Sequence, residues 1–158
     1  MSYTRYPPQG VRGFAAVHRG SRYGQIKDYA ATANDAVAVI LQVETPHAID
    51  LIGELAAVPG VDALFVGPGD LAAAMGRVGD VGHAEVQAQI ARAAAAANAV
   101  GKPIGIVGPN PDAVGRFVRY GYDYVAVASD LSLLTGRAVE WIGAIRGQRP
   151  AATPAAAY

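Results

Sequence analysis

Two carboxylates, Glu44 and Asp70, each follow an apolar run and are the first candidates for chemistry in this sequence. Asp70 comes directly after Gly67-Pro68-Gly69, a turn whose glycines let a ligand approach the backbone. Carboxylate oxygens at the ends of neighbouring strands are suited to a hard divalent cation such as Mg²⁺ or Mn²⁺. Two protein ligands would leave coordination positions for substrate and water, so the pattern predicts a metal site of the catalytic kind.

Each carboxylate also has a simpler interpretation. Asp70 stands at the opening of a predicted helix, where an aspartate often caps the first turn by accepting from a backbone amide. Glu44 could be a surface carboxylate at a strand end. Gln42 precedes Glu44 by two residues, so strand alternation places both side chains on one face of the sheet. If the sheet curls into a barrel, that face is the inside, where an unpaired carboxylate is costly.

Four apolar runs predict the strands that position these residues. They cover residues 37–43, 63–66, 104–107 and 124–127. Helical patterns lie between and after them, at 47–57, 84–100, 111–120 and 131–145. This alternation predicts an α/β fold with right-handed crossovers and a parallel sheet, in which the site lies at the carboxyl ends of the strands. Residues 1–147 are expected to form one domain, and 148–158, with two prolines and no apolar pattern, a disordered tail.

Composition excludes several classes of function. The 158 residues hold 13 Lys and Arg against 13 Asp and Glu, so no net charge attracts nucleic acid or an anionic membrane. The absence of cysteine excludes disulfides, thiolate zinc sites and thiol nucleophiles. Neither a dinucleotide fingerprint nor a P-loop is present. With no apolar stretch of about 18 residues, the chain is expected to be soluble and cytoplasmic, acting on a small molecule.

Several strings, in order and spacing, resemble the HpcH/HpaI aldolase family. They are RYPPQGVRG at 5–13, RYG at 22–24, LQVET at 41–45, VPGVDALFVGPGDL at 58–71, MG at 75–76 and VAVASDL at 125–131. The likeness covers nearly all of residues 5–145. It implies a (β/α)₈ barrel of the TIM type and a class II aldolase, a metal-dependent carbon–carbon lyase. Such an enzyme cleaves or forms 4-hydroxy-2-oxoacids, including 2-keto-3-deoxy sugar acids, from pyruvate and an aldehyde through a pyruvate enolate.

The same resemblance assigns roles to residues of this chain. It makes Glu44 and Asp70 the protein ligands of Mg²⁺ or Mn²⁺, with Co²⁺ as a third candidate. It makes Gln42 a catalytic and substrate-binding hydrogen-bonding residue, and it gives the backbone N–H groups of Gly69 and Asp70 to the pyruvate carboxylate. Orphan amides at a helix N-terminus bind anions readily, which supports the last role. Val107 would line the pocket for the aldehyde.

The length departs from the family. A (β/α)₈ barrel needs about 250 residues, and the four strand-helix units here match its carboxyl-terminal half. The family's catalytic histidine and substrate-polarising arginine fall in the other half. His18, His47 and His83 do not occupy the matching position and are expected to face solvent or cap helices. Two hypotheses stay open: an active aldolase, or a catalytically incompetent half that keeps metal and pyruvate binding or needs a partner half. Unpaired apolar strand edges predict a homo-oligomer or a partner.

Overall fold

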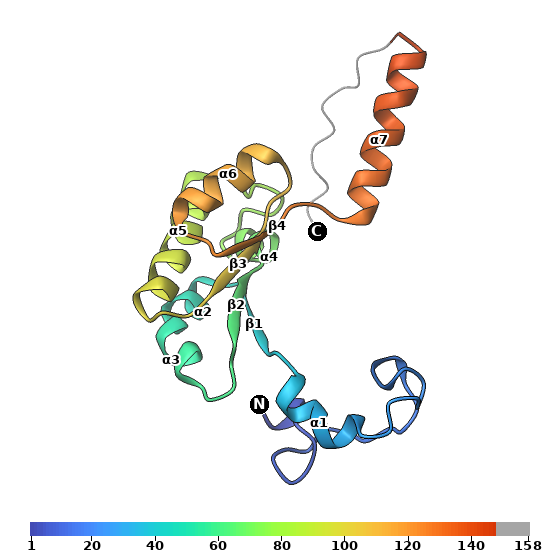
Figure 1. The fold of residues 1–158 in the computed structure, drawn as a ribbon. Helices are drawn as coiled ribbons and strands as arrows, with labels where there is room; N and C mark the ends of the chain where they lie inside the picture. Colours follow the sequence, from blue (N-terminus) through green and yellow to red (C-terminus); the bar gives the residue numbers. More distant parts are fainter. Residues whose placement is uncertain (148–158) are drawn as a thin grey trace.

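The computed structural model describes residues 1–147, and the segment expected to be a disordered tail lies outside the described residues. Four parallel strands form one sheet in the order β1-β2-β3-β4. The strands are β1 Ile40–Val43, β2 Ala63–Val66, β3 Ile104–Val107 and β4 Tyr124–Ala126. Helices separate successive strands (Figure 1), which confirms the predicted α/β fold.

One face of the sheet is covered by helices. They are α2 Pro46–Asp50, α3 Ile52–Ala57, α4 Pro68–Ala74, α5 Ala84–Ala99 and α6 Pro111–Tyr120. The central helix α5 packs on β2 and β3 and contacts its helical neighbours, and α6 packs on β4. Alternate strand residues point into this layer and form the core with Ile52, Ile90 and Phe117, all nearly inaccessible to solvent. The small alanines of α5, of which Ala93, Ala94 and Ala97 are buried, let it approach the strands closely.

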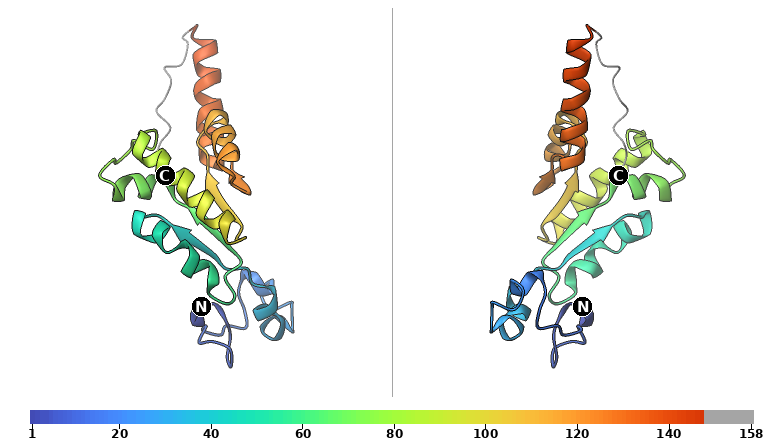
Figure 2. Two further views of the ribbon diagram at one scale, coloured as in Figure 1. Left: turned by 90° about the vertical axis from the view of Figure 1, so that its left-hand side faces the viewer. Right: turned by 90° about the vertical axis from the view of Figure 1, so that its right-hand side faces the viewer.

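The other face of the sheet carries no helix from the described part of the chain (Figures 1 and 2). One row across this face is set by the strand register, which pairs Gln42 with Phe65, Phe65 with Gly105, and Gly105 with Tyr124. The Tyr124 ring lies over Gly105, where a side chain would collide with it. Its hydroxyl donates to the Leu64 carbonyl at 2.7 Å. Phe65 and Tyr124 are only half-buried, so this face lacks the cover that the core face has.

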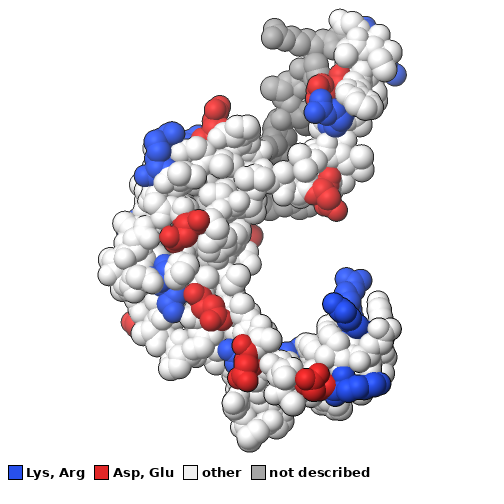
Figure 3. All heavy atoms as spheres, viewed as in Figure 1, with Lys and Arg blue, Asp and Glu red and all other residues white. Residues whose placement is uncertain are grey.

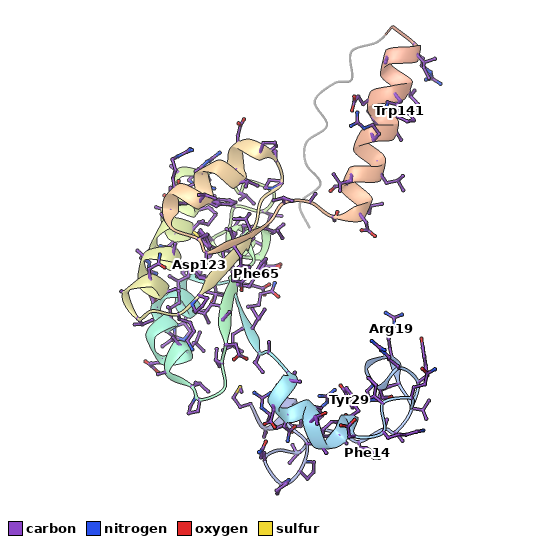
Figure 4. The ribbon with its side chains drawn as sticks, in the orientation of Figure 1. Phe14, Arg19, Tyr29, Phe65, Asp123 and Trp141 are labelled. Carbon is purple, nitrogen blue, oxygen red and sulfur yellow. The ribbon has the colours of Figure 1, made fainter. Side chains whose placement is uncertain are left out.

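Two segments extend from the sheet (Figure 1). The amino-terminal one contains the short helices η1 Ser2–Thr4 and η2 Arg19–Ser21 and the helix α1 Tyr29–Ala36. The carboxyl-terminal helix α7, Asp130–Ile145, points away from the body, and Trp141 on it is 63% exposed (Figure 4). Of the described residues, no helix is long and apolar enough to cross a membrane.

Element boundaries differ from prediction in a few places. The strands at 63–66 and 104–107 begin and end as predicted, whereas β1 begins at Ile40 and β4 ends at Ala126. The helix predicted at 47–57 divides into α2 and α3 at Leu51, whose backbone leaves the helical region with φ −92° and ψ 6°. The apolar residues Ile49 and Ile52 on either side of the break are both buried. A single apolar stripe therefore serves both short helices and hides the break from pattern analysis.

Candidate active site

The carboxyl ends of β1 and β2 lie side by side and form the candidate site. Val43 pairs with Val66 in the ladder, and the Gly67 amide donates to the Val43 carbonyl at 3.1 Å. Glu44 and Gly67 are therefore neighbours across the sheet. Thr45 then turns the chain into α2, because its hydroxyl accepts from the Ala48 amide at 3.0 Å and caps the helix.

Gln42, Glu44 and Gly67 are in direct contact. The Gln42 side-chain amide Nε2 donates to Glu44 Oε1. A Cβ placed on Gly67 would lie 2.7 Å from Glu44 Oε1 and 2.9 Å from Glu44 Cγ. Because real Cβ atoms do not approach oxygen so closely, the carboxylate occupies this position only while residue 67 is glycine. This role of Gly67 is not among the roles predicted from the sequence, although the string Gly-Pro-Gly is the signal for a close approach.

Asp70 lies in the first turn of α4 and follows Gly67 by three residues in the sequence. The helix is capped by Gly67 without a side-chain hydrogen bond, and Pro68 occupies its first position. The interpretation of Asp70 as the capping residue is therefore wrong. Its carboxylate is exposed at a helix N-terminus, where the positive end of the helix dipole favours a negative charge.

The amides of Gly69 and Asp70 precede the first hydrogen-bonded turn of α4. Leu71 is the first residue whose amide closes the turn, onto the Gly67 carbonyl at 3.0 Å. Within residues 1–147, the two amides before it donate to no protein group. They are therefore free to bind an anion, the role that the resemblance to the family implies for them.

Within residues 1–147, no cationic side chain forms an ion pair with either of the two carboxylates. Ion pairs in the described part of the chain join Arg77 to Glu85, Arg92 to Asp50 and Arg137 to Glu140, and none of them includes Glu44 or Asp70. Glu44 is half-buried, and its one hydrogen-bond donor is the neutral Gln42 amide. A half-buried carboxylate without a positive partner is the kind of group that a bound cation stabilises.

The oxygen donors present fit a divalent cation that is completed by substrate and water. Residues 1–147 contain no group of three or more His, Asp or Glu side chains that could form a full metal cage. Glu44 and Asp70 supply two carboxylates at adjacent strand ends, which suits a hard cation that keeps several open positions. The assignment of the two as metal ligands stays a prediction.

Val107 and the histidines complete the set of predicted residues. The ladder pairs Val66 with Ile106, so the next residues along the two strands, Gly67 and Val107, are neighbours. Val107 is half-buried and lies on the uncovered face of the sheet. His18 Nδ1 accepts from the Ser21 amide at 3.4 Å and caps η2, and His83 Nδ1 accepts from the Glu85 amide at 3.3 Å and caps α5. His47 lies exposed on α2. The expectation that the histidines cap helices or face solvent is confirmed.

Known proteins resemble this chain along most of its length. The family model described as HpcH/HpaI aldolase/citrate lyase matches residues 1–136. A 2-dehydro-3,6-dideoxy-6-sulfogluconate aldolase from Pseudomonas putida is 49% identical over 158 residues, which are 100% of this chain and 62% of the relative. A hydroxypyruvate/pyruvate aldolase from Chromohalobacter salexigens is 42% identical over 148 residues, 93% of this chain and 58% of the relative.

A solved structure of the same family also resembles this chain. An HpcH/HpaI aldolase/citrate lyase family protein from Burkholderia cenocepacia J2315 superimposes with a TM-score of 0.80 at 39% identity, covering 90% of this chain and 57% of that one. The chain thus spans about three fifths of the length of these relatives, and the predicted barrel-type fold class is confirmed. From the match of the family model, the sequence identities and the shared fold, this chain belongs to the HpcH/HpaI aldolase/citrate lyase family.

Proposed function

We propose that this chain carries the metal-binding and substrate-binding half of a divalent-metal-dependent aldolase. The enzyme would be a carbon–carbon lyase that cleaves or forms 4-hydroxy-2-oxoacids through a pyruvate enolate, working in the cytoplasm. The observation that carries the proposal is the half-buried Glu44 carboxylate, which Gln42 holds against Gly67 beside the first turn of α4 and which has no ion-pair partner among residues 1–147. The aldolase names of relatives that are 42–49% identical support the same reaction class.

In this proposal each residue has a separate task. Glu44 and Asp70 would hold the cation, and Gln42 would fix the orientation of the Glu44 carboxylate. The Gly69 and Asp70 amides would donate to the carboxylate of the 2-oxoacid, and Val107 would offer an apolar wall to the aldehyde end. A bound Mg²⁺, Mn²⁺ or Co²⁺ would supply the positive charge that stabilises negative charge developing on the substrate oxygens.

Proton transfer needs a group other than the residues of the proposed site. Breaking the carbon–carbon bond requires removal of a proton from the C4 hydroxyl, yet among the described residues no histidine is hydrogen-bonded to Gln42 or Glu44, whose side chains bond to each other. General acid-base groups contribute about 10²- to 10⁴-fold. The isolated chain is therefore expected to bind metal and pyruvate with little turnover. Of the two hypotheses, the aldolase names of the relatives favour an active enzyme over a barrel half that only binds metal and pyruvate. Its activity would require an acid-base group from outside the described residues.

Titration calorimetry with Mn²⁺ tests the metal site. The wild-type chain should bind one equivalent. Glu44→Gln and Asp70→Asn should each weaken binding by more than the roughly 10- to 100-fold that the loss of an outer partner costs. Glu54→Gln, which changes an exposed carboxylate on α3, is the matched control and should bind like the wild type.

A second titration, with pyruvate or its isostere oxamate, follows on the same samples. Binding should require Mn²⁺ in the wild type and disappear with excess EDTA. Equal Mn²⁺ affinity in all four proteins would remove the site assignment, and pyruvate binding that ignores EDTA would remove the role of the metal.

A further inference from the structure

One row of residues crosses the sheet at the level of the candidate site. Val107 pairs with Ala126 in the ladder between β3 and β4, and Gly67, which follows β2, is the neighbour of Val107 on the other side. Glu44 stands at the same level after β1, in contact with the position of Gly67. The row therefore begins with a proposed metal ligand and ends, at Ala126, with a single methyl group.

Strand alternation fixes the face on which the Ala126 methyl lies. The ring of Tyr124, two residues earlier on β4, lies over Gly105, and its centroid is 6.0 Å from that of the Phe65 ring, so it is on the face of the candidate site. Val125 points the other way and packs against the core. Ala126 therefore shares the face of Tyr124, and it is exposed there.

Two aromatic rings close the next row toward the amino ends of the strands. The Tyr124 ring fills the space over Gly105, where a Cβ would collide with it. Its hydroxyl is held by the Leu64 carbonyl at 2.7 Å, and the Phe65 ring lies beside it (Figure 4). A molecule bound at the level of Val107 therefore cannot extend toward the amino ends of the strands. It can extend only along the row or away from the sheet.

We propose that Ala126 determines how long a 2-oxoacid the site accepts. This inference rests on the proposed function, in which the carboxylate end of the substrate is bound at the start of α4, just after β2. Adjacent strands lie about 4.8 Å apart, and an extended carbon chain advances about 1.3 Å per bond. About four bonds beyond the keto carbon thus bring the sixth carbon over β3, within reach of a side chain at position 126. The Ala126 methyl leaves this space open, and a larger side chain would fill it.

The surroundings of Val107 and Ala126 suit the uncharged part of such a substrate. None of the four strands contains a charged residue, and the concave margin beside the sheet is mostly uncharged in Figure 3. An acid group would instead be bound by the free amides of Gly69 and Asp70. The row therefore offers an anion site at one end and apolar contacts to the carbon chain at the other.

Titration with two acids of different length, each in the presence of Mn²⁺, tests the proposal. Pyruvate ends before β3, whereas 2-oxohexanoate carries its sixth carbon over it. Ala126→Leu should leave the pyruvate affinity unchanged and lower the 2-oxohexanoate affinity at least about tenfold, because the space for the longer chain is filled. Ala126→Val, which suits a strand, should lower it by less. Ala95→Leu makes the same change at an exposed position of α5 and should bind both acids like the wild type.

The pyruvate titration separates this inference from the proposed function. A wild-type chain that binds no pyruvate would overturn the proposed function and this inference with it. If the wild type binds pyruvate but not 2-oxohexanoate, or if Ala126→Leu binds 2-oxohexanoate as well as the wild type does, only the role of Ala126 is overturned. Should Ala126→Leu lose both acids, Ala126→Val decides: an unchanged ratio of its two affinities would show that position 126 supports the fold and does not select substrates.

Discussion

Gly67 is the residue on which the Glu44 position depends. Its φ of −92° and ψ of 93° are accessible to any residue, so a methyl group there would cause no backbone strain. The methyl would instead meet Glu44 Oε1 at 2.7 Å and Gln42 Nε2 at 3.1 Å. A substitution at this position can therefore displace the Glu44 carboxylate without straining the backbone.

We expect Gly67→Ala to keep the free energy of unfolding within about 1 kcal/mol of the wild type, because the two long side chains can move away. Mn²⁺ affinity should fall at least tenfold, since the carboxylate is displaced. Gly53→Ala on α3 is the control, because a Cβ there meets nothing within 4 Å. Unchanged Mn²⁺ affinity in Gly67→Ala would show that Glu44 binds metal from a different position, or not at all.

A buried phenol gives the fold a dependence on alkaline pH. Burial raises the pKa of Tyr122 well above its ordinary value of about 10, and its hydroxyl donates to the Ile90 carbonyl at 2.9 Å. Above about pH 10 the unfolded chain loses this proton while the folded chain keeps it. The stabilisation is therefore complete below about pH 10 and declines as the pH rises.

Tyr122→Phe should lower the free energy of unfolding by about 1 kcal/mol near neutral pH, through loss of the hydrogen bond. The deficit should shrink by about pH 11, because phenylalanine has no proton to lose. Urea unfolding at the two pH values measures both quantities. A deficit that stays constant or grows with pH would contradict the expected sign of the pH dependence.

Most of the candidate site can be predicted from the sequence. The remaining part requires knowledge of how the strands pair. Glu44, Gln42 and Asp70 can be recognised as candidates because they stand at predicted strand ends. The contact between Glu44 and Gly67 could not be predicted, because it requires the pairing of Val43 with Val66. Without the register, the sequence also cannot show whether Asp70 caps the helix or binds the metal. The structure excludes the capping role and leaves the metal-binding role as a prediction.

At the scale of the elements, two aspartates join neighbouring strands at their amino ends. Asp62 Oδ2 accepts from the Val39 amide at 2.7 Å, and Asp123 Oδ2 accepts from the Ile104 amide at 2.8 Å. Each aspartate follows a left-handed glycine by two residues, Gly60 or Gly121, and directly precedes a strand. The repeated arrangement fixes the relative positions of adjacent strands before the ladder begins.

Asp123→Ala should therefore lower the free energy of unfolding by about 1–3 kcal/mol, because it leaves the Ile104 amide without an acceptor. Asp123→Asn keeps an oxygen acceptor and should lower it by less. Chemical denaturation of the two variants beside the wild type provides the comparison. Equal stability of Asp123→Ala and wild type would mean that the ladder alone sets the register of β4.

These side-chain contacts also explain why β1 is shorter than predicted. The apolar run begins at residue 37, but the Val39 amide donates to Asp62 and the Val37 carbonyl accepts from Arg5. Two backbone groups before Ile40, the Val39 amide and the Val37 carbonyl, are thus used by side chains, whereas the Val39 carbonyl accepts from the Asp62 backbone amide at 2.9 Å. The central strands β2 and β3 have partners on both sides, and their boundaries follow the apolar pattern. Composition and periodicity therefore predict inner strands better than edge strands.

For the whole molecule, α7 is the element least connected to the rest. Its large apolar side chains are all exposed. They are Leu131, Leu133, Leu134, Val139, Trp141, Ile142 and Ile145. The sequence predicts the helix from its period but not its position, because the pattern shows which side chains are apolar and not what they pack against.

An isolated helix of this length is marginal in water, because most helical stability in proteins comes from packing of the apolar face. α5, by contrast, has the same length and five buried residues in the core. In a dilute sample, the α7 amides should exchange with deuterium on the order of a hundredfold faster than the α5 amides. Hydrogen-exchange mass spectrometry on peptides from 84–99 and 130–145 measures the ratio. Protection of α7 equal to that of α5 would show that its apolar side chains are packed in solution, in contrast to their exposure in the single chain.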